Sequence, residues 1–423
     1  MEFGEESPWK YDDKEQTNVN LPVGFSFDDD DGDDGDDEDD CPHASPRISS
    51  VSAVSFPVCP MSPETPYTRS PLHRNSPSPL FLYDCLASLH FSKGSILSIA
   101  VTKDSIFTGS STSKIHAWKL PECMDMGCAK TPSGEIRAMS AHGKTLFTTH
   151  GDCRTRAWEF SPAQKFRLKK KATLPPRRKS FFPFSKKGNN NNNNNSTHWH
   201  NKVSVSCLAY DTNEELLFMG SADQTVHVWK ILEKKCTESF KAHEGRVSAI
   251  VVNQQDRCVF TCSCDGTLKM WRRVYRESSH ILIMVLMSQP CPINALALSS
   301  SPNDCYLYSG SSDGIINFWG KEIISGRYNH AGFLRGHHFA ILCLATIGRL
   351  ILSGSEDATI RIWKREHGSP LHSSLAVIDG HHGPVKCLAA VMKSDYENLG
   401  GILVCSASLD QTLKVWKVKV SDS

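Results

Sequence analysis

The sequence lacks any apolar segment long enough to cross a membrane. Its longest unbroken apolar run, Ile281–Met287, has seven residues, whereas a membrane-spanning helix needs about 20. The first residues, MEFGEESPWK, also lack the basic and then apolar order of a secretory signal. The 16 cysteines are therefore expected to remain reduced thiols in a cytoplasmic or nuclear protein.

Motifs that mark several enzyme classes are missing as well. The sequence has no phosphate-binding glycine-rich loop followed by Lys-Ser or Lys-Thr, and no His-Glu-x-x-His zinc motif. Cys262 and Cys264 form a Cys-x-Cys pair, but no second pair or histidine accompanies it at the spacing of a zinc site. We therefore expect no enzymatic activity, no metal and no cofactor.

Tryptophan marks seven copies of one short pattern. In six copies an Asp lies six residues before the Trp: Asp152/Trp158, Asp223/Trp229, Asp265/Trp271, Asp313/Trp319, Asp357/Trp363 and Asp410/Trp416. The seventh ends at Trp118, with Thr112 in the place of the Asp. A polar residue there suits a tight turn between two strands, and the alternating apolar residues that follow place one face in a core. Such a repeat predicts a stacked array.

Three copies carry an upstream His and a Ser or Thr in addition. These sets are His243, Thr261, Asp265, Trp271; His337, Ser353, Asp357, Trp363; and His381, Ser406, Asp410, Trp416. Their residue types match those of a hydrolase triad. Because the set recurs three times at expected hairpin turns, a structural hydrogen-bond network is favoured over catalysis.

With these marks the chain resembles a WD-repeat β-propeller over residues 80–420. Gly336-His337 and Gly380-His381 supply the Gly-His marks of such repeats. The phrases SSDGIINFW, LRGHHFAILCLA, GHHGPVKCLA and SLDQTLKVWKV resemble, more narrowly, plant WD-repeat proteins of the JINGUBANG type. The resemblance implies an all-β, seven-bladed β-propeller that acts as a non-enzymatic plant regulator.

The repeats also predict where each blade begins and how the ring closes. Inner strands are expected to begin near Ile96, Ile136, Val205, Val247, Ile293, Ile341 and Val385. The last copy ends at its third strand, so Leu82–Leu89 is expected to supply the fourth. This strand would close the ring and cover its free edge.

Residues 1–79 have a different composition from the repeats. They hold 18 acidic and 5 basic residues, a net charge of −13, and Asp28–Asp40 is nearly all acid. A Ser/Pro-rich tract with several Ser-Pro and Thr-Pro pairs follows. Because this composition cannot bury enough apolar area to offset chain entropy, we predict a disordered tail. The tail is either a solvating segment or one tuned by phosphorylation.

A second unusual segment separates the second and third copies. Trp158 and Trp229 are 71 residues apart, against 40 to 53 for the other neighbouring pairs. Phe166–Leu174 is expected to form the fourth strand of blade 2, and residues 175–200 an insert between blades 2 and 3 that contains seven consecutive Asn. The basic residues of this region are Lys169, Lys170, Lys171, Arg177, Arg178, Lys179, Lys186 and Lys187. Three alternatives stay open: a solvated loop, a nuclear-import patch, or a contact with nucleic acid or anionic lipid.

Function is therefore expected on the propeller face made by the hairpin turns and by the loops that lead into the inner strands. The polar residues there that we take as candidate partner contacts are Glu244, Arg246, His338, Glu356 and His382. The sequence predicts a monomeric scaffold that binds protein partners in signalling or transcriptional regulation. The alternative is a substrate receptor of a cullin-type ubiquitin ligase, although its usual Trp-Asp-x-Arg box is absent.

Overall fold

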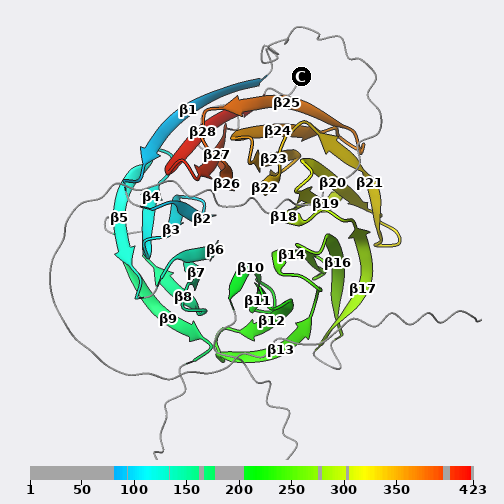
Figure 1. Cartoon of the computed structure of the whole chain (residues 1–423), viewed down its shortest axis with the longest axis horizontal. Coiled ribbons are helices and arrows are strands. Elements are labelled where there is room, and N and C mark those ends of the chain that lie inside the picture. The colour runs from blue at the N-terminus through cyan, green and yellow to red at the C-terminus, as the bar shows by residue number, and fades with distance from the viewer. Residues whose placement is uncertain are drawn as a thin grey trace, which may run out of the picture. The chain divides into compact units, whose positions relative to one another are not determined.

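The predicted propeller is present in the computed structural model. The structure describes residues 81–92, 94–132, 134–161, 166–176, 204–274, 279–301, 304–393 and 401–420. These residues form 28 β-strands. The strands make seven four-stranded antiparallel sheets, the blades, which surround a central axis (Figure 1). The predicted all-β, seven-bladed fold is therefore confirmed.

Each blade runs from an inner strand at the axis to an outer strand at the rim. Blade 1 has β2 (Ile96–Val101), β3 (Ser105–Ser110), β4 (Lys114–Lys119) and β5 (Met124–Lys130). Blade 2 has β6 (Ile136–His142), β7 (Thr145–His150), β8 (Thr155–Phe160) and β9 (Leu168–Leu174). Blade 3 has β10 (Val205–Asp211), β11 (Leu216–Ser221), β12 (Thr225–Lys230) and β13 (Lys235–Lys241). Blade 4 has β14 (Val247–Val252), β15 (Val259–Ser263), β16 (Thr267–Val274) and β17 (Ser279–Ser288).

The remaining three blades complete the ring. Blade 5 has β18 (Ile293–Ser301), β19 (Asp304–Ser311), β20 (Ile315–Lys321) and β21 (Tyr328–Arg335). Blade 6 has β22 (Ile341–Ile347), β23 (Leu350–Ser355), β24 (Thr359–Arg365) and β25 (His372–Asp379). Blade 7 has β26 (Val385–Lys393), β27 (Gly401–Ser408), β28 (Thr412–Val420) and, at the rim, β1 (Phe81–His90). All seven inner strands begin at the predicted residues.

The burial of the strands follows from the stacking of blades face to face. The second strand of a blade is covered on both sides, and every residue of β11 and β23 is buried. An inner strand has one row of side chains that faces the neighbouring blades and one row that faces the axis. The residues of β10 accordingly alternate between buried and half-buried positions. The Trp of each repeat fills the space between adjacent sheets, as Trp271 does in the core between blades 3 and 4.

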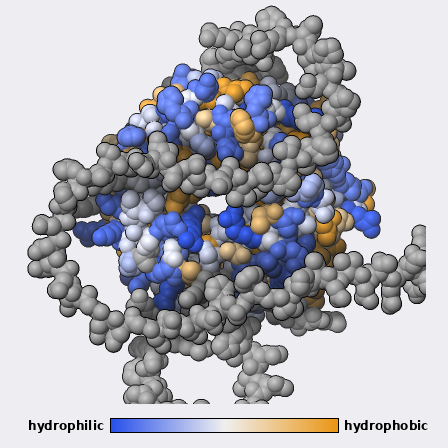
Figure 2. Space-filling model, in the orientation of Figure 1, coloured by the Kyte–Doolittle hydropathy of each residue, from blue (hydrophilic) through white to orange (hydrophobic). Residues whose placement is uncertain are grey.

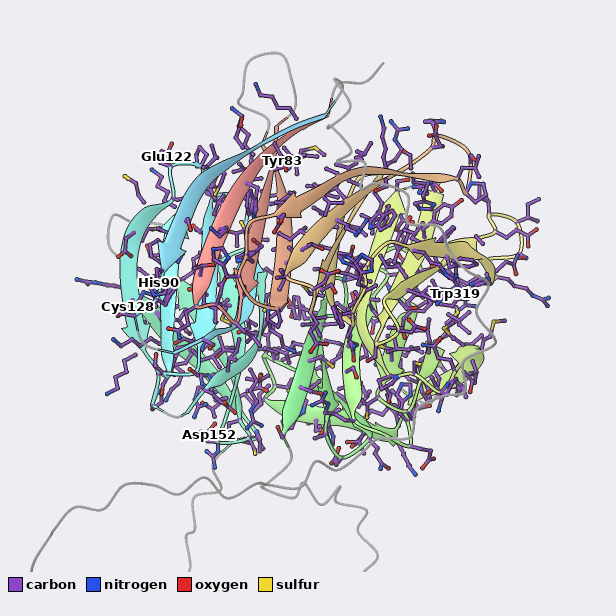
Figure 3. The ribbon with its side chains drawn as sticks, turned by 45° about the horizontal axis from the view of Figure 1, so that its top comes forward. Tyr83, His90, Glu122, Cys128, Asp152 and Trp319 are labelled. Atoms are coloured by element: carbon purple, nitrogen blue, oxygen red, sulfur yellow. The ribbon has the colours of Figure 1, made fainter. Side chains whose placement is uncertain are left out.

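Closure of the ring depends on a strand from the other end of the described chain. β1 pairs antiparallel with β28 in a register that runs from Phe81 opposite Val420 to His90 opposite Thr412. The Tyr83 ring packs against Trp416 with ring centroids 6.4 Å apart. Figure 3 shows Tyr83 and His90 near opposite ends of this outer strand. The predicted closing strand, Leu82–Leu89, is therefore confirmed and one residue longer at each end.

Cysteine thiols connect neighbouring blades near the axis. The thiol of Cys343 donates to the carbonyl of Val385 at 3.3 Å, and that of Cys387 donates to the carbonyl of Leu97 at 3.2 Å. Burial raises the pKa of Cys207 and of Cys387 to about 12. These cysteines therefore stay protonated, and a small side chain with a donor suits the close approach of two inner strands.

The structure does not describe the predicted tail, residues 1–79. Most of the predicted insert, residues 177–200, also lies outside the described residues. The predicted fourth strand of blade 2, Phe166–Leu174, is confirmed as β9 and begins two residues later, at Leu168. Lys169, Lys170 and Lys171, which their composition groups with the basic insert, therefore lie in this strand at the rim of blade 2, where their side chains are exposed.

Candidate functional site

The hairpin turn of every repeat has the same backbone geometry. In each of the seven blades, the residue that follows the turn Asp, or Thr112 in blade 1, has a left-handed φ between 58° and 78°. These residues are Ser113, Cys153, Gln224, Gly266, Gly314, Ala358 and Gln411. Only two of the seven are glycine, although glycine adopts this conformation at the least cost. All seven turns lie on one side of the ring, called here the ring face, together with the loops that enter the inner strands.

The predicted set of blade 6 forms one continuous hydrogen-bond chain. The Nε1–H of Trp363 donates to Ser353 Oγ at 3.1 Å, and the Ser353 hydroxyl lies 2.8 Å from His337 Nε2. On the other side of the imidazole, Nδ1 lies 2.8 Å from Asp357 Oδ2. Burial lowers the pKa of His337. A neutral ring with its proton on Nδ1 satisfies both contacts.

The sets of blades 7 and 4 repeat this arrangement with one variation. In blade 7, His381 lies 2.7 Å from Ser406 Oγ and 3.0 Å from Asp410 Oδ2. In blade 4, His243 Nε2 lies 2.7 Å from Thr261 Oγ1, while Nδ1 meets Thr267 Oγ1 at 2.7 Å and the Asp265 carboxylate only at 3.6 Å. The structure thus brings the members of all three predicted sets together.

Burial decides what this Ser-His-Asp geometry can do. Ser353 and Ser406 are 0% exposed, and each hydroxyl oxygen also accepts a hydrogen bond from a Trp. A substrate carbonyl cannot reach such an oxygen, so the resemblance to a hydrolase triad does not extend to catalysis. The carboxylates instead fix the ring face, since the Asp357 and Asp410 side chains accept backbone N–H groups of His338 and His382 at 3.2 and 2.9 Å.

One hydrolase-like pattern escaped the sequence analysis. Residues 310–314, Gly-Ser-Ser-Asp-Gly, match the Gly-x-Ser-x-Gly pattern of hydrolase nucleophiles. In the structure they form the end of β19 and the turn into β20, whereas a nucleophile elbow leads from a strand into a helix. The central Ser312 accepts a hydrogen bond from the side-chain amide of Asn294 at 3.0 Å. This serine has no base beside it and belongs to the rim of the pocket described next.

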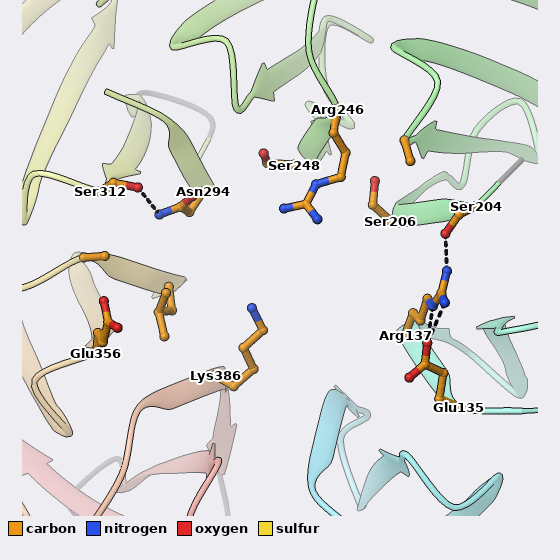
Figure 4. Close-up of a pocket in the computed structure, with 13 residues that line it drawn as sticks. Glu135, Arg137, Ser204, Ser206, Arg246, Ser248, Asn294, Ser312, Glu356 and Lys386 are labelled. Carbon is orange, nitrogen blue, oxygen red and sulfur yellow. Dashed lines mark hydrogen bonds and ion pairs between the residues drawn. The ribbon is translucent and has the colours of Figure 1, made fainter. Parts of the chain in front are cut away.

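A pocket of about 750 Å³ opens on the ring face at the central axis (Figure 4). Figure 2 shows the central opening of the ring with polar side chains, coloured blue, at its edge. Two rows of residues line the pocket: the residues that precede inner strands or turns, and the second residues of the inner strands. They are Glu135, Ser204, Ala222, Arg246, Ser312, Ala340, Glu356; and Arg137, Ser206, Ser248, Asn294, Leu342, Lys386.

The charges in the pocket are only partly paired. Arg137 donates to Glu135 and to Ser204, so its charge is satisfied within the wall. Arg246 and Lys386 point into the pocket from blades 4 and 7 (Figure 4). Within the described chain, neither side chain forms an ion pair. The pocket therefore presents two free cations against the one free carboxylate, that of Glu356.

The five predicted contact residues occupy two positions on the ring face. Arg246 and Glu356 line the pocket. Glu244, His338 and His382 lie outside it, exposed at the outer ends of loops whose backbone is held by the turn carboxylates. The structure thus divides the predicted set between a central pocket and the ring that surrounds it.

Sequence reasoning missed three residues of this face. Arg137 and Lys386 lie two positions after predicted pre-strand residues, on the row of the inner strand that faces the axis. Phe339, in the loop before β22, exposes 61% of its surface. Its signal in the sequence is an aromatic residue directly after the Gly-His-His of a repeat, where the structure needs none for its core.

A second, basic depression lies on blade 2, away from the axis. The cavity has a volume of about 470 Å³ and is lined by Arg154, Arg156, Lys170, Lys171 and Lys234, with no acidic residue. Arg156 is bound by the Asp152 carboxylate and Lys171 by Glu159. Arg154 Nη1 is buried without a hydrogen-bond partner in the described chain. This depression suits an anionic ligand.

No three His, Cys, Asp or Glu side chains within the described ranges are placed to hold a metal ion. The described part of the chain also contains no helix with the length and apolar character needed to span a bilayer.

One known protein family matches the second part of the ring. The family described as "WD domain, G-beta repeat" matches residues 193–230, 234–272, 282–320, 329–364 and 372–417. These five segments cover most of blades 3 to 7. Blades 1 and 2 have the same strand order and the same turn geometry without a family match.

Individual relatives match shorter stretches. Periodic tryptophan protein 2 homolog of Schizosaccharomyces pombe is 27% identical over 139 residues, 31% of this chain and 16% of its own length. A p21-activated protein kinase-interacting protein 1-like protein of Danio rerio is 41% identical over 70 residues, 16% of this chain and 19% of its own. A U3 snoRNP-associated protein-like protein of Arabidopsis thaliana is 35% identical over 82 residues, which are 19% of this chain and 17% of its own length. The chain thus spans less than a fifth of the length of these relatives.

Proposed function

Because the chain is a β-propeller built of WD repeats, we propose that it is a non-enzymatic scaffold that binds protein partners on its ring face. The observation that carries the proposal is the central pocket with its unpaired Arg246 and Lys386. A cation that no carboxylate of the described residues neutralises can pair with one from a partner, and such pairs orient and accelerate association.

The surroundings of the pocket define the partner further. Phe339 offers an exposed aromatic side chain on the same face, and aromatic residues are common energetic centres of protein interfaces. The surrounding Glu244, His338 and His382 provide a polar rim. The proposed partner segment therefore carries a carboxylate for Arg246 and Lys386 and an apolar side chain for Phe339.

Affinity purification with quantitative mass spectrometry tests this function. The Arg246→Glu/Lys386→Glu variant is compared with the unmodified protein, and we expect its specific partners to fall at least tenfold. The matched control is Lys103→Glu/Lys119→Glu, which makes the same change of charge at exposed positions on the opposite end of blade 1. Equal partner recovery with both variants would contradict the proposal.

The finer parts of the function rest on resemblance. The likeness to plant JINGUBANG-type proteins supports a plant regulator in signalling or transcription. The name of the Arabidopsis relative instead supports an assembly with a U3 snoRNP. The second interpretation favours a nuclear location over the cytoplasm, which imaging of a tagged chain tests. The proteins recovered with the bait separate the two processes, and recovery of cullin adaptors would support the ligase alternative.

A second candidate function, contact with RNA, is favoured by the basic depression of blade 2. Lys170 and Lys234 are exposed there, and the buried Nη1 of Arg154 has no partner. Phosphate groups pair with such clusters, and their contribution weakens with salt. Binding of a fluorescent RNA oligonucleotide is measured across a salt series for Lys170→Glu and for the control Lys235→Glu on β13. We expect only the former to weaken binding; equal effects, or binding to anionic vesicles alone, would contradict RNA contact.

A further inference from the structure

The outer strand of blade 4, β17, exposes an unbroken apolar run to solvent. Ile281, Leu282, Ile283, Met284 and Val285 each expose between 36% and 47% of their surface. Five consecutive exposed aliphatic side chains mean that both faces of the strand are apolar. Figure 2 shows orange side chains on the rim where Figure 1 places β17. Soluble proteins rarely leave such a patch without a partner.

The other outer strands are protected by their composition. Each of β1, β5, β9, β13, β21 and β25 contains at least one Asp, Glu, Lys or Arg. β17 contains none. All seven outer strands share a bulge opposite the repeat Trp, and β17 has a second one, where Leu268 and Lys269 face Met287 and Val285. Charged residues normally block the pairing of an edge strand with another chain, and β17 lacks this block.

The ends of β17 are fixed to the neighbouring blades. At its start, the backbone N–H of His280 donates to the Glu238 carboxylate of blade 3 at 2.7 Å, and its Nδ1 lies 2.6 Å from the other carboxylate oxygen. Just after its end, the Gln289 side chain donates to Ser311 Oγ of blade 5 at 2.8 Å. The strand is thus held in an extended form before any partner arrives, which lowers the entropy cost of binding.

We propose that β17 is a docking edge to which an extended, uncharged aliphatic segment of another protein adds as a fifth strand of blade 4. The outer main-chain edge of β17 pairs with no strand of the described chain, so an added strand can pair with it along residues 281–285, beyond the bonded His280. This surface lies at the rim, away from the pocket at the axis, and does not depend on the function proposed for that pocket.

The lack of charge selects the chemistry of the occupant. From Ser279 to Pro290 the chain has no acidic or basic residue apart from His280, which faces Glu238. A charged side chain of a partner placed beside Ile283 or Val285 would lose hydration without gaining a counter-charge. A segment of consecutive uncharged residues with apolar groups, in contrast, places one row of side chains against each apolar face of β17.

The shape of the edge selects a flexible segment over a second copy of the propeller. A ten-residue strand is about 33 Å long, and a paired strand lies about 4.8 Å away. Two convex rims that touch along such a strip bury far less than the about 800 Å² per partner of a stable interface. A peptide strand can also fold its side chains over both faces of the edge, which a second rigid rim cannot do.

The test uses the full chain and a synthetic 12-residue peptide of alternating Val and Thr with a Lys at each end. We expect saturable binding, and we expect the peptide to slow hydrogen exchange of the backbone amides of residues 281–285. Ile283→Glu/Val285→Glu should weaken binding at least tenfold. Val377→Glu, at an exposed position of the outer strand β25, is the matched control and should leave binding unchanged.

Several results would overturn the proposal. Binding without protection of β17, or equal binding by the double variant, would place the peptide elsewhere. A dimer in sedimentation that dissociates on Ile283→Glu/Val285→Glu would identify a second copy as the occupant. The exchange measurement on the unmodified chain needs no variant, so it decides the matter even if the double variant folds poorly.

Discussion

His337 Nδ1 lies 2.8 Å from Asp357 Oδ2, and this contact joins the two kinds of loop that make the ring face of blade 6. His337 belongs to the loop before β22, and Asp357 to the turn between β23 and β24. Since a buried polar group without a partner destabilises the fold, the pair fixes both loops relative to the core. The same contact in blade 7, at 3.0 Å, gives the neighbouring part of the face the same support.

Asp357→Ala should lower the free energy of unfolding by about 1–3 kcal/mol, the cost of leaving buried donors unsatisfied. The lost acceptor serves His337 Nδ1, the His338 amide, and the amide and hydroxyl of Thr359. Urea denaturation measures the effect. Asp313→Ala is the control, because the side chain of exposed Asp313 accepts only the amide of Ile315, in a blade without the His. Equal losses of unfolding free energy in the two variants would show that the histidine network is not the cause.

Stability should fall as the pH is lowered from about 6.5 toward 4. Burial lowers the pKa of His243 and of His227 to about 4, from a usual value of 6.5. In this window the unfolded chain binds protons that the folded chain does not, so acid favours unfolding. Melting temperatures between pH 7.5 and 4.5 test this. His243→Gln should make the dependence on pH shallower, and an unchanged slope would contradict the assignment.

Removal of β1 should destabilise the whole ring. A chain without residues 1–90 exposes the edge of β28 and loses the contact of Tyr83 with Trp416. A chain without residues 1–75 retains β1. We expect the first truncation, and not the second, to lower the melting temperature measured by circular dichroism. Equal melting temperatures would mean that closure does not depend on this strand.

Substitutions at the left-handed turn position should act in opposite directions in two blades. Ala358 has φ of 64°, a conformation that costs a residue with a side chain roughly 1–2 kcal/mol. Ala358→Gly should therefore raise the melting temperature. Gly314→Ala should lower it, because φ is 78° and a Cβ there would lie 2.9 Å from the His337 carbonyl oxygen. A fall in both variants would show that the backbone strain is already relieved at Ala358.

The sequence was sufficient for the fold because its signals are local and repeated. The first residue of every inner strand, from Ile96 to Val385, is almost completely buried, so an apolar residue is required there. The closing strand could be predicted because a four-stranded blade with three strands at its C-terminal end needs a fourth from elsewhere. Lys169–Lys171 could be placed in a strand because blade 2 needs a fourth one, although their basic composition also groups them with the insert that follows.

The site was predicted only in part, for a geometrical reason. Arg246 and Glu356 precede a strand and a turn, and such positions lie on the ring face whatever the strand tilt. Arg137 and Lys386 lie where the register of their inner strands shifts, between Ile136 and Ala138 and between Val385 and Cys387, and such a bulge re-aims a side chain in a way that no residue pattern specifies. The exposure of β17 was missed because a run such as Ile281–Met287 has the composition of a buried strand.

Site-specific photocrosslinking tests the central claim, that protein partners bind on the ring face, most directly. A benzophenone amino acid replaces His338, exposed on that face, or Ile324, exposed in the turn between β20 and β21 at the opposite end of a blade. We predict that the His338 position crosslinks a specific partner, that Arg246→Glu/Lys386→Glu abolishes the crosslink, and that the Ile324 position gives none. Crosslinking of the same partner from Ile324, and not from His338, would contradict the account.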